Sequence, residues 1–284
     1  MKELSTKSSK SYQAFMKSPY SSIKHTSYFD VYDNIFSKYI GKKITFIEIG
    51  VLGGGSLFMW RDFFGPDARI IGIDLNPGAK RWEEDGFEIF IGSQADDKFW
   101  KDIFDKIGEV DVVLDDGGHT YEQQIITFDN CLHHIKDGGM IVTEDTHTSY
   151  LSKFGPRTYN FINFAHHQVN KIHDRSFVLS KNKTRDNSIN SIRFFQSIVV
   201  FDINKELASK SSDFIENNKN NTNQQDYRFH SNSFIFYLEK IINNRSNVIN
   251  KLLIIKPLLK LLKYFALKYV SFITYFKLRK YFKS

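Results

Sequence analysis

The chain has little that would suit an exported or membrane-spanning protein. Its single cysteine, Cys131, cannot form an internal disulfide, which argues against a disulfide-built secreted protein and fits a reducing compartment. The opening residues, MKELSTKSSKSYQ, contain no apolar stretch of the kind that a secretory signal needs. No window reaches about 18 uncharged apolar residues, so the sequence predicts no confident transmembrane span. We therefore expect a cytoplasmic protein.

Acidic residues are missing from the last part of the chain. From Lys240 onward there are eleven Lys and Arg residues and no Asp or Glu, which leaves 28 basic and 32 acidic residues before that point. The net charge of +7 therefore describes a mildly acidic body followed by a basic tail. Because a nucleic-acid function would depend on the tail alone, we expect no specific nucleic-acid partner.

Strands and helices alternate through the first half of the chain. Five short runs rich in β-branched residues predict strands at 44–50, 69–74, 87–92, 110–116 and 140–145. The segments between them have helical patterns, and this alternation is typical of a parallel sheet with helices on both faces. The predicted fold class is α/β, with a Rossmann-like, mostly parallel sheet. Ligands of such sheets bind at the carboxyl ends of the strands.

The pattern changes outside this region. A helix is predicted over 27–39 and another over 157–172, followed by a terminal antiparallel hairpin with strands at 176–180 and 191–203. An Asn-rich stretch then indicates a solvated linker. The predicted organisation is an N-terminal helical segment (1–43), a central domain (44–205), a polar linker (206–245) and a basic amphipathic tail (246–284).

The glycine-rich turn in EIGVLGGGSLFMW leads from a strand into a helix. A Walker loop needs a lysine after its last glycine, but Ser56 follows Gly55, and the spacing also fails the G-x-G-x-x-G dinucleotide fingerprint. What remains is E-x-G, ending at Gly50, and an acidic residue, Asp74, that ends the next strand and can accept both hydroxyls of a ribose. This layout favours S-adenosylmethionine (SAM), whose methionine carboxylate Ser56 could hold.

Paired carboxylates end two later strands, in VVLDDGGHT and VTEDTHTSY. Asp115, Asp116, Glu144 and Asp145 would crowd one rim of the sheet and repel one another, and no Lys or Arg lies between 107 and 135. The sequence therefore predicts a hard divalent cation, Mg²⁺ or a similar ion, since oxygen ligands suit such ions.

Several histidines are candidates for the general base. His119 follows Gly117 and Gly118, which allow a tight turn that returns its side chain to the carboxylates. Its alternative role is a helix-start residue that bonds Asp116. His147 ranks second as the base. The remaining adjacent pairs, His133–His134 and His166–His167, are interpreted as surface or packing residues.

The motifs of residues 44–203, taken together and in order, resemble the metal-dependent class I SAM O-methyltransferases that act on sugars. They are EIGVLGGGSLFMW, the IGIDLN strand end, IGSQAD, DVVLDDGGHT, GGMIVTEDTHTSY and SIRFFQSIVVF. This family includes macrolide-sugar enzymes of the mycinamicin type and relatives often labelled cephalosporin hydroxylases.

The resemblance implies a role for each matching residue. It implies that His119 is the catalytic base and that the metal ligands are Asp116, Glu144 and Asp145. The predicted cofactor-binding set comprises Glu48, Gly50, Ser56, Asp74, Ser93, Gln94 and Asp115. The macrolide enzymes carry an extra N-terminal domain that helps to assemble oligomers, whereas about 43 residues precede the first strand here. The resemblance therefore leaves open whether this chain forms a homo-oligomer.

The predicted function is methyl transfer from SAM to a sugar hydroxyl, in the synthesis of a bacterial surface glycan, a glycan precursor or a natural product. Rival interpretations are a methyltransferase of a catechol or other non-sugar acceptor, a hydroxylase, and a non-catalytic SAM-fold protein. An iron hydroxylase normally uses two histidines and one carboxylate, which this carboxylate-rich cluster does not offer.

The tail predicts a peripheral membrane anchor. On a helix over 256–273 the apolar residues fall on one half, whereas Lys256, Lys260 and Lys263 lie opposite. Such a helix can lie in the interface of an anionic membrane, at the inner face of which the protein would then reside. The alternative is that the apolar face docks on this protein or on a second subunit.

Overall fold

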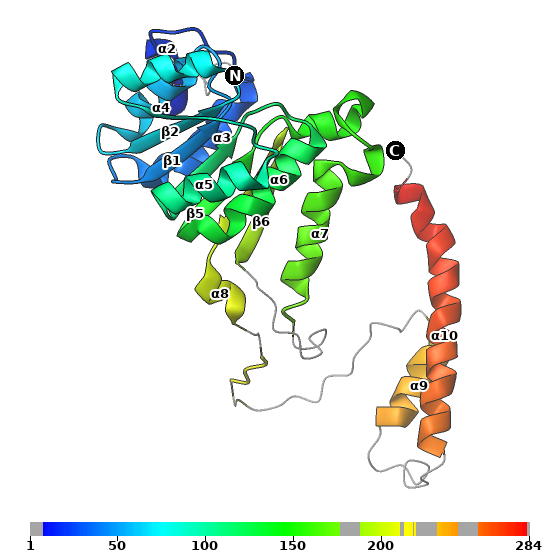
Figure 1. Ribbon diagram of the computed structural model, residues 1–284. Helices are drawn as coiled ribbons and strands as arrows, with labels where there is room; N and C mark the ends of the chain where they lie inside the picture. Colours follow the sequence, from blue (N-terminus) through cyan, green and yellow to red (C-terminus); the bar gives the residue numbers. More distant parts are fainter. Residues whose placement is uncertain are drawn as a thin grey trace. The chain divides into compact units, whose positions relative to one another are not determined.

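The structure is a computed structural model that describes residues 8–176, 188–210, 213–217, 219, 232–243 and 255–282. Two compact units divide the chain, Met1–Phe214 and Ile215–Ser284. The first unit contains the sheet and the second contains two of the helices (Figure 1).

A seven-stranded sheet forms the centre of the first unit, with the strand order β3-β2-β1-β4-β5-β7-β6. Strands β1 to β5 run parallel, whereas β7 pairs antiparallel with both β5 and β6. Their bounds are β1 Thr45–Ile49, β2 Arg69–Asp74, β3 Glu88–Ile91, β4 Val110–Asp115, β5 Ile135–Thr143, β6 Ile189–Phe195 and β7 Ile198–Ile203. The prediction of a mostly parallel sheet that ends in an antiparallel hairpin is confirmed.

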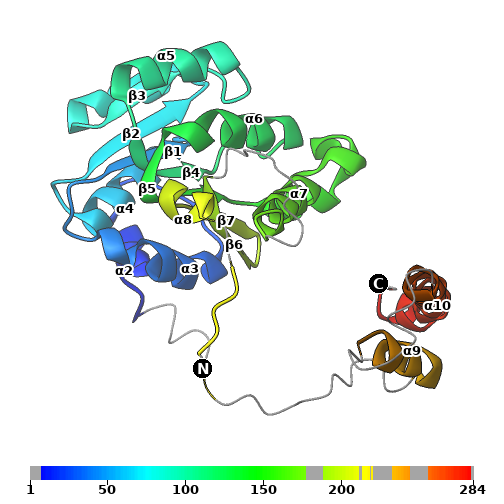
Figure 2. The same ribbon diagram turned by 90° about the horizontal axis from the view of Figure 1, so that it is seen from below.

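Helices cover both faces of this sheet (Figure 2). One face packs against α2 (Lys10–Lys17), α3 (Thr26–Phe36) and α4 (Gly55–Phe64), around a core rich in aromatic side chains. The other packs against α5 (Asp97–Ile107), α6 (Tyr121–Cys131) and α7 (Phe161–His173). Short elements complete the unit: η1 Ser37–Tyr39, η2 Pro77–Asp85, η3 Leu132–His134, η4 Thr146–Tyr150, η5 Ser152–Phe154, η6 Arg157–Tyr159 and α8 Lys205–Ser209.

The carboxyl ends of the central strands lie level with one another. The register pairs Ile49 of β1 with Asp115 of β4, and Asp115 with Thr143 of β5. From β1 the strand order leads through β2 and β3 toward one edge of the sheet, and from β4 through β5 toward the other edge. Parallel sheets of this kind bind ligands in the crevice at such a switch point, here between β1 and β4. The loops after β1, β4 and β5 therefore meet at one place.

The terminal hairpin differs from the prediction. The run 191–203, predicted as one strand, breaks at Gln196–Ser197 into β6 and β7, which pair with each other. Ser197 adopts φ 61°, a left-handed conformation that closes this tight turn. Of the strand predicted at 176–180, residues 177–180 lie outside the described residues.

The second unit contains α9 (Ser233–Asn243), α10 (Ile255–Leu278) and η8 (Arg279–Tyr281). Helix α9 lies within the range predicted as linker, and its buried Ile235 and Leu238 explain why this part is helical and packs on α10. Among the described residues, no helix is both long and apolar enough to cross a membrane.

Candidate active site

The turn between β1 and α4 lies against the end of β4, and Gly50 makes this contact possible. Its φ is 93°, and a Cβ atom at this position would lie 2.1 Å from the carbonyl oxygen of Asp116. Any side chain here would therefore combine a strained backbone with a steric clash. The glycine turn predicted from the sequence is thus held directly beside the carboxylate loop.

Asp74 holds the same turn from the other side. Its Oδ2 atom accepts hydrogen bonds from the backbone N–H groups of Val51 and Leu52, both at 2.9 Å. Its Oδ1 atom accepts the N–H of Asn76 at 2.8 Å. Each carboxylate oxygen can accept more than one hydrogen bond, so Asp74 retains acceptor capacity toward a ligand.

A cavity of about 370 Å³ opens over these strand ends. Six of the eleven predicted site residues line it: Gly50, Asp74, Gln94, Asp116, His119 and Asp145. The other wall residues are Ile23, Ile49, Leu52, Ile73, Leu75, Gly92, Gly117, Gly118 and Gln123. Apolar walls with a few polar groups, one of them an acid at the end of β2, suit a nucleoside.

Glu48 and Ser56 bond each other instead of lining the cavity. Glu48 is fully buried and accepts hydrogen bonds from Ser56 Oγ at 2.7 Å and from Trp60 Nε1 at 2.9 Å. Burial raises the pKa of Glu48 to about 7. The Ser56 hydroxyl, expected at a methionine carboxylate, therefore fixes the start of α4 on β1.

Gln94 connects the cavity with buried Asp115. Its Nε2 atom donates to Asp115 Oδ1 at 2.8 Å and to Thr127 Oγ1 at 3.0 Å, while its Oε1 atom accepts the N–H of Gly118 at 3.2 Å. Burial raises the pKa of Asp115 to about 6. Ser93, the neighbour of Gln94, accepts the N–H of Ala95 within its own turn.

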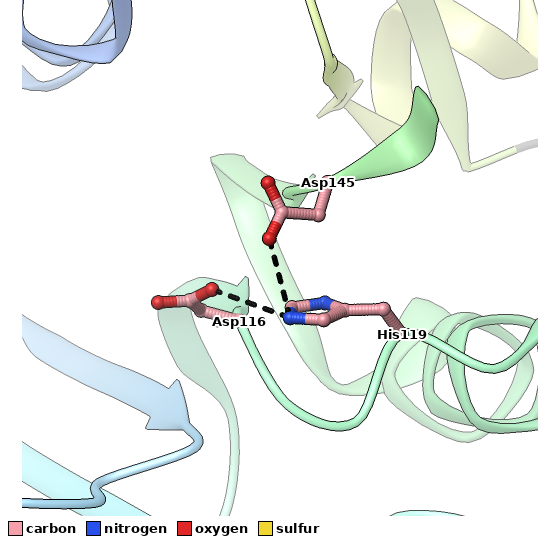
Figure 3. A group of neighbouring side chains, drawn as sticks. All are labelled: Asp116, His119 and Asp145. Carbon is pink, nitrogen blue, oxygen red and sulfur yellow. Dashed lines mark ion pairs between the residues drawn. The ribbon is translucent and has the colours of Figure 1, made fainter. Parts of the chain in front are cut away.

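Asp116, His119 and Asp145 form a cluster at the edge of the cavity (Figure 3). The His119 Nε2 atom lies 3.3 Å from Asp145 Oδ2 and 3.9 Å from Asp116 Oδ1. All three side chains are about one-fifth exposed. His119 and Asp145 both have positive φ values, 57° and 53°, a strained conformation that recurs at functional sites.

Glu144 and Asp116 share a cation that the sequence reasoning did not find. The Lys24 ammonium group, whose side chain is 2% exposed, contacts Asp116 Oδ2 and lies 3.0 Å from Glu144 Oε2. Burial alone lowers the pKa of Lys24, but the charges of Asp116 and Glu144 outweigh this and hold the pKa well above its usual value. Lys24, in the N-terminal segment, therefore offsets part of the repulsion predicted among the carboxylates.

Two tyrosines of α3 also contact these carboxylates. Tyr32 donates its hydroxyl hydrogen to Glu144 Oε1 at 2.5 Å, and Tyr28 donates to Asp145 Oδ1. Both oxygens of Glu144 are thus engaged, and burial raises its pKa well above the usual value. Asp116 and Asp145 each keep one oxygen facing His119.

Two further histidines approach Asp145 from the outside. His25 Nε2 lies 3.7 Å from Asp145 Oδ1, and His147 Nδ1 lies 3.9 Å from the same atom. They are 62% and 44% exposed, against 21% for His119. Of the histidines that the sequence ranked, His119 is therefore the one held between two carboxylates.

A second cavity, of about 140 Å³, lies on the other side of the cluster. Three residues line both cavities: Ile23, Asp116 and Asp145. Four others line the smaller cavity and not the larger one: Lys24, His25, Tyr28 and Glu144. The two carboxylates therefore stand at the junction between the two spaces.

The donor set fits a divalent cation. One ligand atom from each of Asp116, His119 and Asp145 lies within 4.8 Å of the other two. The ring nitrogen of His119 that faces these carboxylates is Nε2, and its other ring nitrogen, Nδ1, is buried and has no hydrogen-bond partner among the described residues. The carboxylate oxygens of Asp116 and Asp145 are the donors of this set that suit Mg²⁺ or Mn²⁺.

Comparison with known proteins gives the same picture. Residues 47–146 match the family described as "Methyltransferase domain". Together with the strand order, this decides the fold. The first unit has the class I methyltransferase fold. The strands that carry the candidate site all lie within or beside the matched residues.

Several relatives are named as O-methyltransferases, and some of these names specify a rhamnosyl substrate. The chain is 34% identical, over 44% of its length and 32% of the relative's, to mycinamicin VI 2''-O-methyltransferase of Micromonospora griseorubida. It is 32% identical, over 46% and 35%, to 8-demethyl-8-alpha-L-rhamnosyl tetracenomycin-C 2'-O-methyltransferase of Streptomyces olivaceus. These matches confirm the predicted resemblance to sugar O-methyltransferases. The chain spans about one-third of the length of these relatives.

A solved structure is similar as well. The methyltransferase MycE of the mycinamycin biosynthetic pathway, solved in complex with Mg and SAH, matches with a TM-score of 0.58 and 26% identity. The match covers 63% of this chain and 49% of MycE. The similarity thus extends from the sequence motifs to the fold.

Proposed function

We propose that this protein is a SAM-dependent O-methyltransferase that methylates a sugar hydroxyl with the help of a divalent cation. The observation that carries this proposal is the junction of the larger cavity with the Asp116–His119–Asp145 cluster at the ends of β1, β4 and β5. A nucleoside site and a base would therefore meet where one reaction can use both. The names of the similar proteins supply the substrate class.

The cofactor would lie in the larger cavity. Asp74 would accept a ribose hydroxyl at the acceptor site that its three backbone hydrogen bonds leave on Oδ1. Gly50 would leave room for the methionine part beside the backbone, and Gln94 would fix the adjacent wall. Glu48, Ser56, Ser93 and Asp115 would support that pocket from behind. SAM supplies a methyl group on a positively charged sulfur, which an oxygen nucleophile can attack.

The cation would be held by carboxylate oxygens of Asp116 and Asp145, with Glu144 as the third acidic residue of the same rim. A divalent cation lowers the pKa of a hydroxyl group that it binds. In the protein itself, Tyr28 holds Asp145 by a hydrogen bond, which fixes the direction of its remaining oxygen.

His119 would act as the general base. Its Nε2 atom faces the carboxylates at the junction of the two cavities, so an acceptor hydroxyl placed there could give its proton to this atom. Asp145, 3.3 Å away, would stabilise the imidazolium that results. The protein otherwise positions the two reactants, which is a large part of catalysis in methyl transfer.

The acceptor class can be tested directly. The purified full-length chain would be incubated with SAM labelled with tritium in its methyl group, Mg²⁺, and matched panels of sugar and catechol acceptors. We expect label on a sugar, lost when a chelator is added and regained with excess Mg²⁺. Label on catechols alone would favour the non-sugar methyltransferase, and full activity with the chelator would contradict the metal.

Helix α10 supports a second role, attachment to an anionic membrane surface. Eight of its exposed apolar residues follow helical spacing and form one stripe: Leu258, Leu261, Leu262, Phe265, Tyr269, Phe272, Ile273 and Phe276. The contact with α9, which includes the ion pair of Lys263 with Glu239 at 2.7 Å, leaves this stripe uncovered. Basic residues beside an apolar stripe suit the surface of anionic lipids.

Two substitutions with equal charge separate this role from plain electrostatic attraction. Phe265 lies in the stripe and Tyr264 outside it, and both are more than half exposed. We expect Phe265→Glu to weaken binding to phosphatidylglycerol vesicles at least tenfold and Tyr264→Glu to weaken it much less. Equal losses would contradict insertion of the stripe, and a changed oligomeric state of Phe265→Glu would place the stripe in a subunit interface.

A further inference from the structure

The N-terminal segment places a positive charge inside the acidic rim. Lys24 precedes α3. Its ammonium group contacts Asp116, which lies 92 residues later in the sequence, and Glu144, which lies 120 residues later. The side chain is 2% exposed, so this contact is a buried one and not a surface ion pair. A lysine in such a position is held there by the carboxylates on both sides.

The ammonium group occupies the position of a bridging cation. It touches one oxygen of Asp116 and one of Glu144, two of the three predicted metal ligands. A Mg²⁺ ion held by Asp116 and Glu144 would lie about 2.0–2.1 Å from their oxygens and would therefore overlap the space that the ammonium fills. Two cations cannot share that space, because their charges repel at such short distance.

The surroundings leave Lys24 a way out. Its neighbours Ile23 and His25 are 91% and 62% exposed, and residues 21–25 form no helix or strand. The segment before them is anchored by Ser18, whose hydroxyl donates to the carbonyl of Gly55 at 2.8 Å. The side chain of Lys24 can therefore turn toward solvent while the segment stays attached to α4.

We propose that Lys24 is a built-in competitor of the divalent cation: its ammonium neutralises Asp116 and Glu144 in the metal-free protein, and metal binding displaces it. This inference rests on the proposed function, because it concerns the metal of that site. In the metal-free protein Lys24 holds the acidic rim together, and in the loaded protein Asp116, Glu144 and Asp145 are all available to the ion.

Removal of the competitor tests this directly. Lys24→Met keeps the length of the side chain and removes its charge, and Lys17→Met is the matched control, because Lys17 pairs with exposed Asp62 at 3.1 Å on the same N-terminal segment. Mn²⁺ binding to the full chain would be measured by calorimetry. We expect the dissociation constant to fall at least tenfold in Lys24→Met and to stay unchanged in Lys17→Met.

Displacement can also be followed in the unaltered protein, which covers the case that Lys24→Met does not fold without metal. Acetic anhydride modifies free amines, and mass spectrometry of peptides reports each lysine separately. We expect Lys24 to be protected without metal and to become reactive at saturating Mn²⁺, whereas Lys17, 65% exposed, reacts equally in both states.

The outcomes are distinct. If Mn²⁺ binds and Lys24 stays protected, or if Lys24→Met binds Mn²⁺ no more tightly than the unaltered protein, the ion lies beside the ammonium and the competition is refuted. If neither protein binds Mn²⁺, the metal of the proposed function fails together with this inference.

Discussion

Replacement of Asp74 tests the cofactor assignment, because the hydrogen bonds of this carboxylate determine how much cofactor affinity should be lost. The carboxylate lies at the wall of the larger cavity and already accepts three backbone N–H groups. Asp74→Asn keeps its shape but removes its charge and part of its acceptor capacity. A hydrogen bond to a charged group contributes about 1.5–3 kcal/mol, so we expect a loss of about 1.5–3 kcal/mol for the ribose hydroxyl that Asp74 would accept.

That loss corresponds to a dissociation constant for S-adenosylhomocysteine that rises about 10- to 150-fold in calorimetry. The decisive comparison uses a cofactor analogue without the two ribose hydroxyls, for which Asp74→Asn should cost little. Asp67→Asn, an exposed aspartate on the loop before the same strand, serves as the control. Equal losses for both ligands would show that Asp74 only holds the glycine turn, and unchanged affinity would refute the cofactor site.

Three further predictions concern His119, Gly50 and Glu48. His119→Asn, which tolerates the left-handed backbone, should lower kcat by roughly 10²–10⁴ with cofactor affinity within a few-fold, whereas exposed His147→Asn should change kcat little; a loss confined to affinity would make His119 a pocket residue. Gly50→Ala should lower the Tm far more than Gly41→Ala, because both have positive φ but only Gly50 has an atom within 4 Å of the added Cβ; equal shifts would contradict the close approach. Burial raises the pKa of Glu48 to about 7, so the folded protein binds this proton more tightly than the unfolded chain does. The free energy of unfolding should therefore fall by on the order of 3 kcal/mol as pH rises from about 4.5 to 7. Glu48→Gln should flatten this slope in denaturant titrations at several pH values.

The sequence predicts the parts of this site that local pattern controls. Each strand of the parallel sheet is a short β-branched run, and the residue that ends it must lie at one edge, so Asp74, Asp116 and Asp145 could be placed together. His119 could be placed beside them because it follows the β4 loop directly. The alternation of strands and helices fixed the fold class for the same reason.

The sequence does not predict contacts that depend on distant packing or on the start of a helix. Lys24 and Tyr32 reach Glu144 across more than a hundred residues, and no local pattern marks that approach. Ser56 turns toward Glu48 because α4 begins at Gly55, which places the hydroxyl on the sheet side of the helix. The break at Ser197 was missed because the apolar pattern of β6 continues into β7.

Only one of the two α-helices of the second unit was predicted. The apolar pattern of α10 predicted a helix, which the structure contains over Ile255–Leu278. Helix α9 lies beyond the Asn-rich stretch, and its sequence, SFIFYLEKIIN, has apolar residues at helical spacing. This local signal for a helix was present in the range predicted as linker and was missed.

A crystal structure of the full chain with S-adenosylhomocysteine and Mn²⁺ tests the central claim most directly, since the anomalous signal of manganese locates the ion. The account predicts the ribose hydroxyls at Asp74 and an anomalous peak at the carboxylates of Asp116 and Asp145. A nucleoside bound elsewhere, or a manganese ion away from this rim, would contradict it.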